Sequence, residues 1–159
     1  MFARPVYIDT SVIGGYFDSE FAEATRRFWE LGHRGEYRFV TSEVTAAEVS
    51  EAPEPVRELF AESFPELIEV GSEAEALADA YVDAGVVSSR FRDDALHVAV
   101  CTLEGISPLA SWNFRHLVNL RREEGFNATN LLRGLPMLRI VSPLELLGDE
   151  EEDDESENG

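Results

Sequence analysis

The sequence RDDALHVAVCTLEGISPLASWN, residues 92–113, decides the class of fold that we expect for this chain. Its segment from Ala95 to Leu103 is apolar on nearly every side, which predicts a helix buried within the protein. Pro108 to Trp112 follows it as a short strand. We therefore expect a domain that combines buried helices with a sheet.

Strands and helices alternate along the chain on both sides of this stretch. Further strands are predicted at residues 5–9, 37–40, 67–70 and 138–141, and helices at residues 21–31, 42–52, 56–64 and 73–85. Ser72 is expected to cap the last of these helices and Gly85 to end it. We predict a single α/β domain over residues 1–147, with helices on both faces of a mostly parallel sheet of about four or five strands.

The charge of the chain excludes several kinds of chemistry. Its 159 residues include 32 acids and 13 bases, a formal net charge of -19, and every base is an arginine. A chain without lysine has no lysine Schiff base, phosphate-loop lysine or lysine general base. The acidic surplus also argues against a protein that coats nucleic acid or anionic membrane through bulk charge, because both are polyanions.

The single cysteine and the hydropathy bear on where the protein works. Cys101 has no partner for an intrachain disulfide, so a reducing cytoplasm is the natural compartment. The N-terminus lacks the apolar stretch of a signal peptide, and no run approaches the roughly 18 residues of a membrane span. We expect a cytoplasmic protein with no membrane contact.

Acids are concentrated at the C-terminus. Residues 148–159 read GDEEEDDESENG, with eight acids and no base, and we predict that they form a disordered tail. The remaining residues, 1–147, hold 24 acids and 13 arginines, a formal charge of -11. Codon bias towards arginine could explain the missing lysine but not the acids, so this surface favours a halophilic source.

Three acids take positions that acids usually avoid. Asp9 ends the first predicted strand, at the edge where open parallel sheets collect ligands, although a lone Asp there could equally be a turn residue or helix cap. Glu48 lies four residues after Val44 and shares the inward stripe of its helix, unless the helix rotates it to solvent. Asp94 opens the buried helix, where it or Asp93 is expected to be the cap while the other points along the buried face.

These acids can meet at one edge of the sheet. Asn113 ends the strand at 108–112 and could likewise be a helix cap, but it also adds a fourth oxygen ligand. Three carboxylates cannot crowd together without a counter-charge, and Mg²⁺ or Mn²⁺ supplies one while preferring oxygen ligands. No His/Cys cluster has zinc spacing. His97 is expected to be a core residue with a hydrogen bond rather than a ligand.

The pattern resembles the PIN-domain family, metal-dependent ribonucleases that include many toxins of toxin–antitoxin pairs. The matching segments are 7–18, 42–49, 92–105, 109–119 and 130–147, and DDALHVAV followed by SWNFRHL is the most specific part. The resemblance implies one or two metal ions and places Asn113 where the family more often has Asp. The site residues that it implies are Asp9, Glu48, Asp94 and Asn113 as catalytic and metal-binding residues, with Thr10 and Ser111 in support.

The resemblance also implies a substrate and partners. We expect hydrolysis of RNA phosphodiester bonds, a possible cognate antitoxin protein and a homodimer. The segment from Arg90 to Arg122 has five arginines against three acids, a local balance of +2 in an otherwise acidic chain. The residues expected to bind RNA are Arg90, Arg92, Arg115 and His116.

Other functional classes compete with this interpretation. A catalytically weak PIN-like module, its site reduced by Asn113, would act through a protein partner. A phosphate-accepting receiver domain relies on a lysine late in its sheet, and this chain has none. A haloacid-dehalogenase-type phosphatase needs a second acid two residues after the first, where this chain has Ser11.

Overall fold

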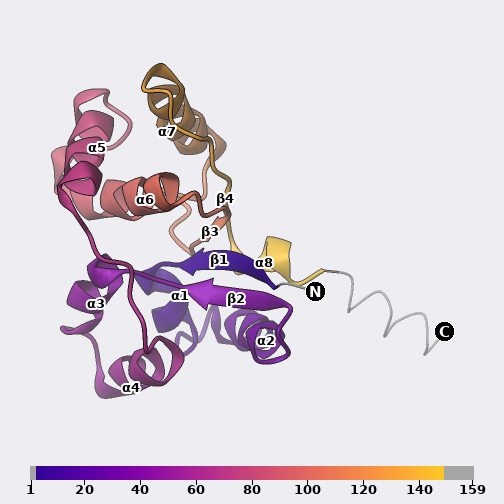
Figure 1. The fold of residues 1–159 in the computed structure, drawn as a ribbon. Helices are drawn as coiled ribbons and strands as arrows, with labels where there is room; N and C mark the ends of the chain where they lie inside the picture. Colours follow the sequence, from indigo (N-terminus) through magenta and orange to yellow (C-terminus); the bar gives the residue numbers. More distant parts are fainter. Residues whose placement is uncertain (1–2, 149–159) are drawn as a thin grey trace.

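Four parallel strands organise the domain in the computed structural model, which describes residues 3–148. They are β1 (Arg4–Ile8), β2 (Tyr37–Val40), β3 (Leu109–Ala110) and β4 (Ile140–Val141), and they lie in the order β2-β1-β3-β4 (Figure 1). The central β1 pairs Tyr7 with Val40 on one side and with Leu109 on the other. The predicted α/β class with a parallel sheet is confirmed.

The helices lie between and around these strands, as expected from the alternation of the sequence. They are α1 (Thr10–Gly15), α2 (Ala22–His33), α3 (Glu43–Val49), α4 (Glu54–Ser63), α5 (Ser72–Asp83), the 3₁₀ turn η1 (Ser89–Phe91), α6 (Arg92–Glu104), α7 (Leu120–Leu132) and α8 (Pro143–Leu146). Within residues 3–148, no helix is both long and apolar enough to cross a membrane. The predicted disordered tail falls outside the described residues from 149 onwards.

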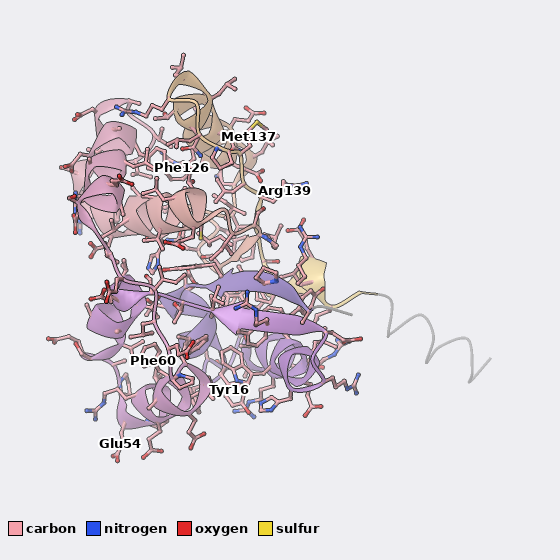
Figure 2. All side chains as sticks on the ribbon, viewed as in Figure 1. Tyr16, Glu54, Phe60, Phe126, Met137 and Arg139 are labelled. Carbon is pink, nitrogen blue, oxygen red and sulfur yellow. The ribbon has the colours of Figure 1, made fainter. Side chains whose placement is uncertain are left out.

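Helices cover both faces of the sheet, and successive side chains of β1 point to opposite faces. Tyr7 packs into a core with α5, α6 and α7, whereas Val6 and Ile8 pack into a second core with α1, α2 and α4. Figure 2 shows the two layers through their aromatic residues, with Phe126 on one side of the sheet and Tyr16 and Phe60 on the other. The central strand is therefore buried on both faces, as parallel sheets require.

The apolar stretch that predicted the fold forms α6. Every residue from Ala95 to Thr102 is buried, and Gly105 ends the helix with a φ of 68°, which favours glycine. The prediction that Asp93 or Asp94 caps this helix was wrong. The turn η1 leads the backbone into the helix early, so that Phe91 takes the cap position and both acids lie inside the first turn, where the helix dipole favours them.

Two other local predictions also need correction. Residues 67–70 form no strand: Leu67 is exposed, and Ile68 alone makes an isolated bridge, with Ser42 just beyond the end of β2. The sheet thus has the smaller of the two predicted strand numbers. Ser72 is the first residue of α5 rather than its cap, because Gly71 holds the extended cap conformation.

Candidate functional site at the carboxyl edge of the sheet

Asp9 directly follows β1, caps α1 and carries a buried carboxylate. Its Oδ1 accepts hydrogen bonds from the Ser11 hydroxyl at 2.6 Å and from the backbone N–H of Val12 at 3.2 Å, and the residue is only 4% exposed. The predicted helix cap is confirmed, and capping fixes the carboxylate at the carboxyl edge of the sheet. Burial raises the pKa of Asp9, although the charge of His97 and these hydrogen bonds act against the rise.

Ser11 and Ser111 join the ends of β1 and β3. The Ser11 hydroxyl oxygen accepts a hydrogen bond from the backbone N–H of Trp112 at 2.8 Å and lies 3.3 Å from Ser111 Oγ. Ser111 Oγ in turn accepts from the backbone N–H of Asn113 at 2.9 Å. This chain of hydroxyls holds Asn113 in register with Asp9, so the two strand ends present their polar side chains as one unit.

Glu48 reaches the same edge from α3. Its Oε1 accepts a hydrogen bond from the Thr10 hydroxyl at 3.0 Å and lies 2.6 Å from His97 Nε2. The side chain therefore turns towards α1 and α6, although it keeps 33% of its surface exposed. Burial favours the neutral acid, but the bond to His97 and its charge outweigh this effect and lower the pKa of Glu48.

His97 is the buried link between the acids and the core. Its Nε2 contacts Glu48, and its Nδ1 lies 2.7 Å from the Tyr7 hydroxyl, which in turn lies 2.6 Å from Ser42 Oγ. Burial alone would lower the pKa of His97, but the Glu48 hydrogen bond and the negative charges of the three acids raise it. The expected hydrogen-bonded core histidine is confirmed, and its partner makes it the local counter-charge of the acid cluster.

Asp94 approaches from the first turn of α6. Its Oδ2 lies 3.3 Å from His116 Nδ1 and 3.4 Å from the amide nitrogen of Asn113, which donates to it. Burial raises the pKa of Asp94, and the charges of Asp9 and Glu48 add to the rise while His97 and His116 oppose it. The charges of Asp9 and Glu48 therefore reach Asp94, although the three acids come from elements far apart in the sequence.

The side-chain amide of Asn113 hydrogen-bonds to Asp94 through its nitrogen and to the backbone through its oxygen. Its Oδ1 accepts a hydrogen bond from the backbone N–H of His116 at 3.0 Å, while its Nδ2 faces Asp94. It therefore closes a turn rather than capping a helix. An Asp here would place a fourth acid against Asp94, whereas the amide can donate to that carboxylate.

The predicted RNA-binding residues divide into two groups. Arg92 forms salt bridges with Glu75 at 2.6 Å and Asp79 at 2.7 Å, so two acids already neutralise its charge. The other three, Arg90, Arg115 and His116, line one pocket beside the acid cluster. Tyr7, Ser11 and Phe91 also neighbour the site, and no sequence pattern singled them out, whereas Arg122 belongs to the arginine-rich segment that the sequence indicated.

Comparison with known proteins supports the fold. No protein-family model matches the chain. No curated protein matches it either. Among solved structures, a chain in the crystal structure of VapBC2 from Rickettsia felis bound to a DNA fragment from their promoter is similar over 87% of this chain and 98% of that chain, with a TM-score of 0.54 and 14% sequence identity. At this identity the likeness shows a shared fold, and the α/β architecture is the same.

Proposed function

We propose that this protein is a metal-dependent endoribonuclease that uses Mg²⁺ or Mn²⁺ at the carboxyl edge of its sheet. One observation carries the proposal: the ends of β1 and β3, with α3 and α6, present Asp9, Glu48, Asp94 and Asn113 at one edge of the sheet, where burial raises the pKa of Asp94 and the charges of Asp9 and Glu48 add to the rise. Carboxylates held together against their mutual repulsion are typical of sites that a cation completes. The sequence resemblance to PIN-domain ribonucleases and the fold shared with the VapBC2 chain agree with this function.

The donors suit a hard divalent cation in their chemistry. They are carboxylate oxygens with the Thr10 hydroxyl nearby, and oxygen ligands of this kind are the ones that Mg²⁺ and Mn²⁺ prefer. Within residues 3–148, however, no three His, Cys, Asp or Glu side chains stand close enough to form a complete metal site as they lie. Glu48 is instead bound to His97, so it would have to share or leave that contact to join Asp9 and Asp94 around an ion.

Each residue has a definable task in phosphodiester hydrolysis. A bound ion would supply positive charge for the phosphate and activate water for attack. Asp9 is held in place by Ser11 and Val12, and Asp94 by Asn113, so these two acids are oriented before any ion binds. The contact with His97 lowers the pKa of Glu48, which favours its ionised form. His116, which contacts Asp94, would bind a phosphate oxygen of the substrate.

The test is RNA cleavage by the purified protein with a matched site variant. Mixed RNA is incubated with the wild-type protein or with Asp9→Asn, with Mn²⁺, with Mg²⁺, or with a chelator. We expect cleavage by the wild-type protein with either ion, none with the chelator, and products that carry 5′-phosphate ends. Asp9→Asn keeps an acceptor for Ser11 and Val12 but loses the charge, so it should fold and fail to cleave. Equal, low degradation by both proteins would remove the nuclease proposal.

The second candidate is a PIN-like module that binds a protein partner without catalysis. The amide of Asn113 at the fourth acidic position and the engagement of Glu48 by His97 favour it. The cleavage experiment separates the two candidates. We also propose an antitoxin-type protein partner and a homodimer: co-purification with the product of the neighbouring gene tests the first, and light scattering after gel filtration tests the second.

A further inference from the structure

Three arginines gather in one pocket next to the acid cluster. Arg90, Arg115 and Arg122 line it with Phe91 and His116, and Val87 and Ser88 complete the wall of a cavity of about 690 Å³. The chain carries only 13 arginines against 32 acids, so a pocket with three of them is a local reversal of the overall charge. Such a reversal points to an anionic ligand.

The charges in this pocket are not neutralised by acids of the described residues. No acidic side chain between residues 3 and 148 forms a salt bridge with any of the three, whereas Arg92 and Arg139 outside the pocket are each paired with acids. Arg122 donates a hydrogen bond to the backbone carbonyl of Val86. Arg90 lies over the Phe91 ring, 5.6 Å from its centroid. Two of the guanidinium groups are thus positioned without losing their charge.

His116 is the wall that the pocket shares with the acid cluster. Its ring packs on Phe91 with 3.9 Å between ring centroids, which fixes the imidazole at the inner end of the pocket. Its Nδ1 lies 3.3 Å from Asp94 Oδ2. His116 thus both lines the pocket of arginines and contacts Asp94 of the acid cluster.

We propose that this pocket binds a backbone phosphate of single-stranded RNA, adjacent along the chain to the phosphate that lies at the acids. The inference rests on the proposed ribonuclease function for the identity of the ligand. One guanidinium group can bind two oxygens of a phosphate at once, and phosphate contacts fix the register of a nucleic acid on its protein. A single strand can turn one nucleotide into a concave pocket, whereas an A-form duplex keeps its phosphates on a stiff helix.

The arginines of the pocket also offset the repulsion between the acidic protein and RNA. The three acids repel RNA until a cation joins them, and the protein as a whole is strongly acidic. Affinity for the substrate must therefore come from a group of cations close to the acids but separate from them. The unpaired arginines beyond His116 meet this requirement.

The experiment compares two double variants that remove the same charge from different places. Arg90→Gln/Arg115→Gln empties the pocket of its two exposed arginines. Arg57→Gln/Arg133→Gln is the matched control, because these residues are exposed, form no salt bridge within residues 3–148, and lie on α4 and just beyond the far end of α7. Arg122 stays in place because it also holds Val86. Thermal melts monitored by circular dichroism confirm that both variants fold.

Binding is measured with EDTA present, so that cleavage plays no part. The probe is a fluorescein-labelled single-stranded RNA of about 12 nucleotides, followed by fluorescence anisotropy over a series of salt concentrations. We expect the pocket variant to bind at least about tenfold more weakly than wild type, since it loses charge-assisted hydrogen bonds. Its plot of log K against log salt should be shallower by about 0.7 for each phosphate that the variant no longer neutralises. The control should keep the wild-type slope.

The outcomes separate this inference from the proposed function. Equal affinities and slopes for the two double variants would overturn the proposal that the pocket binds RNA, whether or not the protein cleaves RNA with Mn²⁺. Absence of cleavage by the wild-type protein would overturn the nuclease, whatever the binding in EDTA shows. A duplex of the same sequence that binds as tightly as the single strand would also overturn the single-strand assignment.

Discussion

The contact between Glu48 and His97 allows the most direct test of how the acid cluster is held. We consider Glu48→Gln, His97→Gln and the double variant as a thermodynamic cycle. The atoms Oε1 and Nε2 lie 2.6 Å apart, and the histidine is 2% exposed while the glutamate is 33% exposed. Breaking a fully buried ion pair costs about 3–5 kcal/mol, but water reaches Glu48, so we expect a coupling energy of about 1–2 kcal/mol.

The coupling should depend on pH in a defined direction. The pKa of Glu48 is lowered by folding, so its contribution is present above the ordinary value of 4.5 and is lost as the pH falls through the folded pKa. The pKa of His97 is raised by folding, so its contribution is full below the ordinary value of 6.5 and is lost as the pH rises through the folded pKa. The coupling should be largest between these two values and should decline at alkaline pH.

Urea unfolding of the four proteins without metal measures the coupling. Each is unfolded at about pH 5.5 and at about pH 9, with the free energy of unfolding extrapolated to water. We expect a positive coupling at the lower pH and a smaller one at the higher pH. A coupling near zero at about pH 5.5, or one that grows at about pH 9, would show that His97 is not the counter-charge of Glu48.

Three further predictions concern the site, its packing and the surface. Asp9→Asn should raise the free energy of unfolding of the metal-free protein by about 0.5–2 kcal/mol, because a buried carboxylate is lost, and it should abolish stabilisation by Mn²⁺. Thermal melts with and without the ion check both results, and a variant less stable than wild type would contradict the electrostatic argument. Gly15→Ala should cost about 1–3 kcal/mol, because a new Cβ would lie 2.7 Å from the Trp112 ring, and urea unfolding measures the loss. Raising KCl from about 0.1 to about 1 M should raise the melting temperature, since the Debye length falls from about 10 to about 3 Å, and a flat or falling melting temperature would contradict a salt-adapted surface.

Patterns that depend on one element were predictable from the sequence. The helix from Arg92 to Glu104 is apolar over most of its length, and a helix that is apolar on nearly every side is stable only when it is buried. Asp9 follows β1, whose last three residues are buried, and a residue at the end of a parallel strand lies at the carboxyl edge of the sheet. The two covered faces of the sheet followed from the alternation of strands with helices.

Features that depend on two elements meeting could not be predicted. The partner of His97 is 49 residues away on α3, and no spacing rule relates the two helices. The cap of α6 depends on the preceding turn η1, which moves the helix start ahead of Asp93. The pocket at Arg90 is likewise assembled from three separate segments, so its residues appear in the sequence only as an excess of arginine.

The net negative charge of the protein predicts repulsion of RNA, whereas the local positive charge of the pocket predicts attraction. Which effect dominates depends on the distance between the charges and the RNA. At physiological ionic strength the Debye length is about 8 Å, so acids on distant faces have little effect at the pocket. The arginines nearby are of two kinds: Arg92 is neutralised by Glu75 and Asp79, whereas Arg90 and Arg115 form no salt bridge with any described residue. In concentrated salt the long-range repulsion falls further, but so does the strength of each phosphate contact. An acidic protein can therefore bind RNA under such conditions only where its few cations are unpaired and close together, which is the arrangement found beside Asp94.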